Sequence, residues 1–213
     1  MAQPRHDPVM FKEVFDLLPL IPGSTAVDGT LGLAGHALEM IRRISPGGKF
    51  LGTDWDRQML EIAKDRIGKP EGTQIDLERC DYREIPKLMQ KRSWRADGIL
   101  LDLGLNSAQI DDPERGIAFK SEGVLDMRMD KTSGEPAASL LNRMSLDQLE
   151  RVLWENGDER WARAIARKIV ERRKVAPLKT TQDLVDCVLA AIPVKARDRR
   201  IHPATRTFMA IRL

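Results

Sequence analysis

Short apolar runs alternate with amphipathic runs through the first half of the chain. The apolar runs recur every 23 to 25 residues, at 25–29, 49–54, 74–79 and 97–104. The stretches between them carry apolar residues at helical spacing, over 35–45, 57–68 and 83–92. Strands that alternate with helices predict βαβ units and a parallel sheet. The fourth run, with Ile99, Leu100 and Leu101 in succession, favours a central strand buried on both faces.

The pattern changes after Gly104. A polar stretch with many glycines and prolines comes first, and segments with helix-start signals follow. Ser145 with Gln148 makes a capping box, and Thr180 with Asp183 approximates a second one. Asp158 is expected to cap the helix between them. Residues from about 106 to 203 are therefore predicted to be mostly helical, without strands.

Charge is distributed unevenly along the 213 residues. Residues 160–213 carry a net charge of +10, residues 1–159 carry −7, and the whole chain is +3. A basic segment on an acidic body suggests a polyanionic partner such as nucleic acid. The alternative is a solvated basic surface without a partner.

The helix expected after Asp158 carries much of this positive charge. Trp161, Ile165 and Ile169 form an apolar stripe that core packing explains. Another face gathers the cations Arg163, Arg167 and Lys174. Arg206, further along the chain, is another candidate for contact with phosphate. These four cations are the predicted RNA-binding residues.

Several classes of protein are disfavoured. No apolar run approaches the ~20 residues of a membrane span, and the N-terminus resembles neither a secretory signal nor a transit peptide. Cys80 and Cys187 lack metal spacing and fit a reducing compartment. We expect a cytoplasmic protein without a metal. Its oligomeric state is left open between a monomer and a homodimer.

The stretch "DGTLGLAGH" at 28–36 carries the first chemical signal. Its glycines follow a predicted strand and precede a predicted helix, which is the context of a nucleotide-binding turn. The spacing is not that of the dinucleotide fingerprint. Asp54 ends the next strand, where an acid commonly holds ribose hydroxyls.

Asp28 indicates which cofactor this turn would bind. A carboxylate at its mouth would repel a pyrophosphate but would stabilise the sulfonium and ammonium of S-adenosylmethionine. The pair Asp28 and Asp54 thus favours S-adenosylmethionine over NAD. Alternatively, Asp28 only caps the turn. His36 is interpreted first as a cap or packing residue, although its backbone amide at the helix start suits a ligand carboxylate.

Asp102 ends the fourth apolar run, at the sheet edge where ligands bind in open α/β folds. Amine methyltransferases use a polar residue here to accept a hydrogen bond from the attacking amine. Positioning then supplies most of the acceleration. Asp102 is the predicted catalytic residue, with cofactor contact alone as the alternative.

Several motifs together resemble the MraW family, bacterial methyltransferases that act on the exocyclic amine of a cytosine in small-subunit ribosomal RNA. They are "HDPVM" (6–10), "DGTLGLAGH" (28–36), "GTDWD" (52–56), "LLDLGLNSAQID" (100–111), "RGIAF" (115–119), "LDMRMD" (125–130) and "HPATRTFMAIR" (202–212). Leu33 and Ala34 depart from the pattern, because the family usually has glycines at both positions.

The resemblance implies a class I S-adenosylmethionine methyltransferase fold, a Rossmann-like parallel sheet with an inserted helical domain. It implies a cofactor-binding domain over 1–105 that resumes at about 204–213, and an RNA-binding insert over 106–203. Family chains continue past "AIRL" with further strands, which we expect to be absent here. The implied cofactor contacts are Ala34, Gly35, His36, Asp54, Tyr82, Asp102 and Gln109.

These observations lead to one main functional hypothesis, an S-adenosylmethionine-dependent methyltransferase acting on the N4 amine of a cytidine in 16S ribosomal RNA. The alternative is an RNA-binding protein that keeps the fold with weak or no turnover. An NAD-dependent enzyme is disfavoured by Asp28 and by the missing fingerprint.

Overall fold

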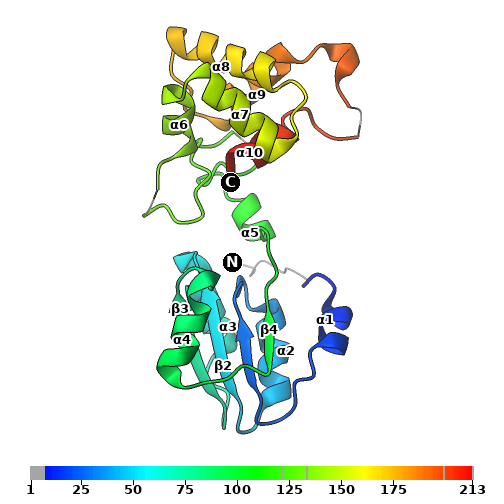
Figure 1. The fold of residues 1–213 in the computed structure, drawn as a ribbon, viewed down its shortest axis with the longest axis vertical. Helices are drawn as coiled ribbons and strands as arrows, with labels where there is room; N and C mark the ends of the chain where they lie inside the picture. The colour runs from blue at the N-terminus through cyan, green and yellow to red at the C-terminus, as the bar shows by residue number, and fades with distance from the viewer. Residues whose placement is uncertain (1–7, 121, 133, 199, 213) are drawn as a thin grey trace. The chain divides into compact units, whose positions relative to one another are not determined.

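The computed structural model describes residues 8–120, 122–132, 134–198 and 200–212 (Figure 1). The chain forms two compact units, Met1–Asn106 and Ser107–Leu213. The division lies next to the expected end of the first domain at residue 105.

The first unit is built on a four-stranded parallel sheet, as predicted. Its strands follow the order β3-β2-β1-β4. They are β1 (Thr25–Asp28), β2 (Lys49–Asp54), β3 (Gln74–Arg79) and β4 (Gly98–Leu100). β1 is buried along its whole length because it lies between β2 and β4.

The prediction that the fourth apolar run is a central strand is wrong. Within the part of the chain that the structure describes, β4 pairs only with β1 and forms an edge of the sheet. Ile99 is 51% exposed as a result, and Leu101 and Leu103 are exposed beyond it. The run of apolar residues reflects strand propensity, but the strand order decides which strand is buried.

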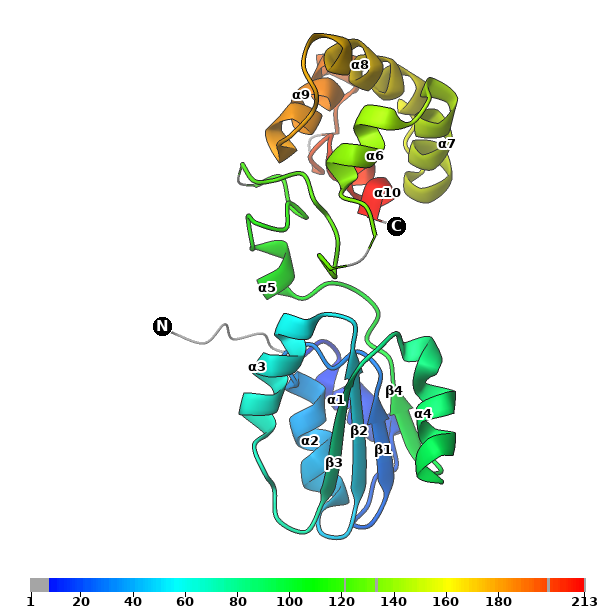
Figure 2. The ribbon, with the colours of Figure 1, turned by 90° about the vertical axis from the view of Figure 1, so that its left-hand side faces the viewer.

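Helices cover both faces of this sheet (Figure 2). One face packs on α1 (Phe11–Leu17), α2 (Gly35–Ile44) and α3 (Arg57–Ile67), with Phe15, Met40, Ile44, Phe50 and Ala63 in its core. The other face packs on α4 (Ile85–Arg92), which a short 3₁₀ turn, η1 (Tyr82–Glu84), precedes; its core comprises Val27, Leu51, Ile85 and Met89. The predicted helices are therefore confirmed.

The second unit is helical, as predicted. It contains α5 (Ser107–Ile110), α6 (Ala137–Arg143), α7 (Leu146–Gly157), α8 (Ala162–Val175), α9 (Thr181–Ala191), η2 (Val194–Ala196) and α10 (Thr205–Arg212). Its described β-structure is a single bridge between Val124 and Thr180. Ile165 and Ile169 of α8 are fully buried in one core with residues of α6, α7, α9 and α10.

The helix caps follow the sequence closely, with one exception. Both predicted capping boxes are present, at the starts of α7 and α9. Asp158 instead ends α7, in a left-handed conformation at φ 46°. The N-cap of α8 is Trp161, which makes no side-chain capping bond, although the Glu159 carboxylate accepts the Trp161 amide just before the helix (3.0 Å). The prediction that Asp158 caps α8 is wrong, because this residue ends the preceding helix instead.

Residues 205–212 belong to the second unit, whereas we expected 204–213 to return to the first domain. As α10, they pack against α7. Phe208 and Ala210 are buried in the helical core. The apolar face of α10 packs against this core, which is why the segment folds with the other helices.

Candidate functional site

The glycine-rich loop that follows β1 is held over the carboxyl ends of three strands. The Gly29 amide donates to the Leu100 carbonyl of β4 (2.9 Å), and the Leu31 amide donates to the Thr53 carbonyl of β2 (3.0 Å). Arg66 of α3 adds a hydrogen bond to the Leu33 carbonyl (2.6 Å). The loop is therefore preorganised by the sheet itself, at the edge where open α/β folds bind ligands.

Three carboxylates meet at this edge. Asp28 ends β1 and pairs in register with Gly52 and Leu100 of the neighbouring strands. Asp54 ends β2 two residues after Gly52, and Asp102 follows the end of β4 two residues after Leu100. The charges of both carboxylates act on Asp28. The structure thus brings together the three acids that were predicted separately as cofactor-binding and catalytic residues.

Asp28 is the most perturbed of the three. It is only 2% exposed, and burial, aided by the nearby charges of Asp54 and Asp102, raises its pKa from 3.8 to about 7. The backbone amide of Thr30, which donates to Asp28 Oδ1 (3.0 Å), lowers the pKa but does not outweigh burial. This bond is the turn cap that was the alternative role for Asp28. The cap and a role toward a cationic ligand are compatible.

Asp54 has a structural partner on each oxygen. Its Oδ2 accepts the Gly32 amide (2.7 Å), and its Oδ1 accepts the Asp56 amide (2.8 Å). These two bonds fix the orientation of the Asp54 carboxylate at the end of β2.

The glycines of the loop have different physical roles. A Cβ at Gly29 would lie 2.4 Å from Leu101 Cδ2, and one at Gly35 would lie 2.6 Å from Pro8 Cγ. These two glycines therefore allow protein atoms to approach, rather than a ligand. Gly32 adopts φ +49°, and an added Cβ would come no closer than 3.7 Å to a neighbouring atom. Glycine therefore suits this position because of its left-handed backbone conformation, and not because a side chain would clash. Ala34 is also left-handed, at φ 61°, which is uncommon for a residue with a Cβ.

The start of α2 offers unpaired donors. Among the described residues, the backbone amides of Gly35 and His36 have no acceptor, as expected for the first turn of a helix. The His36 ring is buried and donates from Nε2 to the Val9 carbonyl (3.0 Å). Its Nδ1 lies 3.9 Å from Asp102 Oδ2. The ring is thus packed within the fold, and the backbone amide is the part of His36 suited to a ligand carboxylate.

Asp102 and Tyr82 border the same edge. The side chain of Asp102 is 38% exposed, so a substrate can reach it. Its backbone amide donates to Thr30 Oγ1 (2.6 Å), which ties it to the loop. Tyr82 is exposed beside Gly29, whose ideal Cβ would lie 3.3 Å from Tyr82 Cβ.

Thr30 is a site residue that sequence reasoning missed. Its amide donates to Asp28 Oδ1 and its hydroxyl accepts the Asp102 amide, so it connects two of the three acids. The only signal was its position two residues after an aspartate, which is typical of an Asx turn.

The predicted residues of the second unit form separate groups. Gln109 is buried in α5, and its contact with a cofactor stays a prediction. Arg163 forms an ion pair with Glu150 of α7 (2.7 Å). Arg167 and Lys174 are exposed on α8 without a hydrogen bond or ion pair to any described residue. The basic face is therefore less uniform than expected, since a neighbouring helix supplies an acid that helical periodicity alone could not reveal.

The donor set of the first unit fits a cationic nucleoside. Carboxylates at the ends of β1, β2 and β4 stabilise positive charge, and the free amides of α2 bind a ligand carboxylate. A pyrophosphate would meet three acids at close range, so a dinucleotide fits poorly. S-adenosylmethionine, which combines a sulfonium, an amino-acid group and a ribose, matches each of these features.

Among the described residues, no group of three His, Cys, Asp or Glu side chains could hold a metal ion. The described helices also include none long and apolar enough to cross a membrane.

Comparisons with known proteins agree with this chemistry. A model of the MraW methylase family matches residues 3–213. Relatives called ribosomal RNA small subunit methyltransferase H include those of Symbiobacterium thermophilum (42% identical over 98% of this chain and 65% of the relative) and Geotalea uraniireducens (41% over 100% and 68%). The one from Pelobacter propionicus is 43% identical over 100% of this chain and 68% of its own. The chain spans about two thirds of the length of these relatives. With a family match over nearly all its residues, the chain belongs to the MraW methylase family.

Proposed function

We propose that this chain binds S-adenosylmethionine and transfers its methyl group to the exocyclic N4 amine of a cytidine in the RNA of the small ribosomal subunit. The main support is that Asp28, Asp54 and Asp102 lie together at one edge of the sheet, beside the unpaired amides of α2. The names of the relatives supply the RNA substrate. A ribosomal substrate in turn implies action in the cytoplasm.

The cofactor-binding roles follow from the groups at this edge of the sheet. Asp54 accepts the ribose hydroxyls, because its carboxylate is already oriented by two backbone amides. The amides of Gly35 and His36, with Ala34 shaping the turn before them, hold the carboxylate of the methionine portion. Tyr82 offers an exposed ring for adenine, and Gln109 is the remaining proposed contact. When bound, S-adenosylmethionine supplies a methyl group already activated by its sulfonium.

Asp102 orients the attacking amine. Its half-exposed carboxylate accepts a hydrogen bond from the cytosine NH₂, which directs the nitrogen lone pair toward the methyl group. The Thr30 hydroxyl fixes the backbone of Asp102 (2.6 Å), so the carboxylate is held in place before the RNA arrives. Buried Asp28 adds negative charge beneath the site and favours a cation above it.

The second unit is proposed to bind the RNA, through Arg163, Arg167, Lys174 and Arg206. Arg163 also pairs with Glu150, an exposed ion pair of the kind that contributes little to stability and can exchange for a phosphate. Counterion release from these cations would make the affinity depend steeply on salt.

The cofactor-binding proposal is tested by calorimetry. We expect S-adenosylmethionine to bind the chain and Asp54→Ala to weaken binding by about 1.5–3 kcal/mol, the value of a hydrogen bond to a charged group. Asp16→Ala, at an exposed position on α1, is the control. Unchanged affinity in Asp54→Ala would remove this residue from the site.

Methyl transfer needs a separate assay, in which small-subunit RNA is incubated with the labelled cofactor and its cytidines are analysed. Incorporation at N4 supports the proposal. Binding of cofactor and RNA without incorporation would instead support the alternative, an RNA-binding member of the family.

A further inference from the structure

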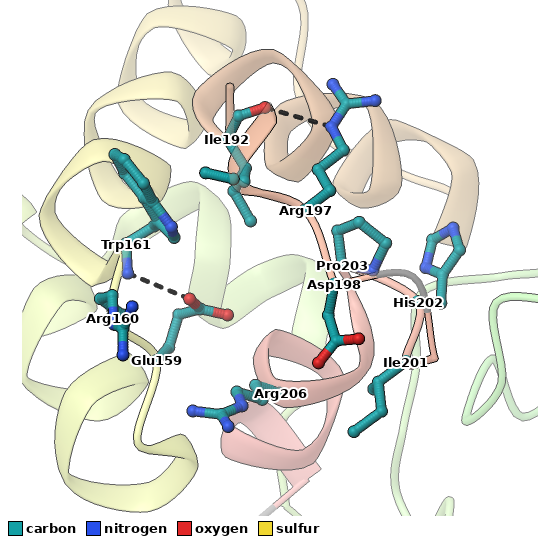
Figure 3. Close-up of a pocket in the computed structure, with 11 residues that line it drawn as sticks. Glu159, Arg160, Trp161, Ile192, Arg197, Asp198, Ile201, His202, Pro203 and Arg206 are labelled. Carbon is teal, nitrogen blue, oxygen red and sulfur yellow. Dashed lines mark hydrogen bonds between the residues drawn. The ribbon is translucent and has the colours of Figure 1, made fainter. Parts of the chain in front are cut away.

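A cavity of about 280 Å³ opens within the second unit (Figure 3). The segment that leads into α8 forms one side, the end of α9 with the chain after it forms another, and the start of α10 closes it. Its size is close to the lower end of the range for pockets that hold small ligands, ~300 Å³.

Arginines outnumber acids in the lining of this cavity. Arg160 is exposed and has no hydrogen bond or ion pair to any described residue. Arg206 uses one donor on the Asp158 carbonyl (2.7 Å). Arg197 donates to the carbonyls of Ile192 (3.2 Å) and Leu189 (2.7 Å). A guanidinium has five N–H donors, so each of these side chains keeps donors for an anion.

The two acids of the cavity are held by other groups. Glu159 is 3% exposed, and its oxygens accept the Trp161 amide (3.0 Å) and the Thr207 hydroxyl (3.4 Å). Asp198 accepts the Arg200 amide (2.7 Å). The three arginines of the cavity still outnumber these two acids, so its lining carries a net positive charge that suits an anion.

Apolar and aromatic walls accompany this charge. Half-buried Trp161 faces the cavity, opposite Ile201 and Pro203 (Figure 3). Its indole N–H has no acceptor among the described residues. His202 accepts the Ala204 amide at Nδ1 (3.2 Å), so in the neutral ring the hydrogen lies on Nε2. The ring stacks on Phe119 at 4.5 Å.

We propose that this cavity binds one unpaired nucleotide of an RNA strand, with its base against Trp161 and its phosphates on Arg160 and Arg206. An aromatic wall beside guanidinium groups is the combination that single-stranded nucleic acids require. Free donors on Trp161 and His202 suit base carbonyls or ring nitrogens. This inference rests on the proposed RNA substrate and adds a recognition site for it in the helical unit.

The test measures the affinity of a fluorescein-labelled single-stranded RNA of about 12 nucleotides, by anisotropy over a range of salt. Trp161→Leu should weaken binding about tenfold or more, from the loss of base stacking. Trp161→Phe keeps an aromatic ring and should remain within about threefold of the parent. The matched control is Trp154→Leu, since Trp154 is an exposed tryptophan of α7 outside the cavity.

The phosphate contacts are tested by charge removal. The double variant Arg160→Gln with Arg206→Gln should flatten the slope of log affinity against log salt by about 1.4, at about 0.7 per phosphate on a single strand. Arg151→Gln, an exposed arginine of α7 outside the cavity, should flatten it less. The inference is overturned if the cavity variants bind like these controls while circular dichroism shows them folded.

Cofactor titration on the same samples separates this inference from the proposed function. If the cavity variants bind RNA normally while the protein still binds and uses S-adenosylmethionine, only the proposed nucleotide-binding role of the cavity is contradicted. Loss of RNA affinity in the cavity variants supports it even if the parent transfers no methyl group. RNA duplex that binds as tightly as the single strand, and is equally sensitive to Trp161→Leu, contradicts recognition of an unpaired base.

Discussion

Asp28 offers the sharpest quantitative test of the site, because burial and two neighbouring acids act on one carboxyl group. Replacing it by asparagine keeps the shape and the oxygen that caps Thr30, but removes the ionisable proton. In the folded chain the pKa of Asp28 is raised from 3.8 to about 7. Between these two pH values the folded state holds a proton that the unfolded state has released, so stability falls as pH rises.

The size of the effect follows from the same numbers. Raising the pKa of this carboxyl from 3.8 to about 7 corresponds to about 4 kcal/mol of stability lost across the interval, at about 1.36 kcal/mol per pKa unit. Little is lost to solvent screening, because Asp28 is 2% exposed. The asparagine side chain of the variant does not titrate. The free energy of unfolding of Asp28→Asn minus that of the parent should therefore grow by up to about 4 kcal/mol between pH 4 and pH 8.

Urea unfolding at several pH values measures this difference, and Asp16→Asn controls for the removal of one exposed carboxylate. The slope of free energy against urea must agree between variants for the comparison to hold. A difference that stays flat from pH 4 to pH 8 would refute the reasoning, since Asp28 would then be ionised throughout.

The same group connects stability to the proposed cofactor. A bound cation favours ionised Asp28, so binding of S-adenosylmethionine below pH 7 should release a proton. Calorimetry in buffers of different ionisation enthalpy detects that release. It should disappear in Asp28→Asn.

Two further predictions concern the substrate. Asp102→Asn should lower turnover on small-subunit RNA more than cofactor affinity, because orienting the amine matters in the transition state; full turnover at saturating cofactor would rule this role out. Arg167→Gln with Lys174→Gln should flatten the salt dependence of RNA binding by about 1.4 for a single strand, and an unchanged slope would exclude this face of α8. Charge reversal at Arg163 is a poorer test, since it would set a second carboxylate against Glu150.

Local patterns predicted much of this protein. The alternation of strands and helices over the first 105 residues, both capping boxes and the helical character of the second unit all depend on neighbours within a few positions. Asp28, Asp54 and Asp102 were also predictable as neighbours, because the carboxyl ends of parallel strands lie along one edge.

Tertiary structure decided what depends on residues distant in sequence. An apolar run cannot reveal whether a strand is central, and β4 lies at the edge because, among the described strands, only β1 pairs with it. The Thr30 hydroxyl accepts the backbone amide of Asp102, which lies 72 residues later in the chain. The local sequence could not reveal this contact. The ion-pair partner of Arg163, Glu150, lies on another helix. Trp161, which begins the apolar stripe of α8, lines a cavity because α9 and α10 leave space around it. Side-chain periodicity assigns a residue to a helix face, but the packing of the other helices determines what that face meets.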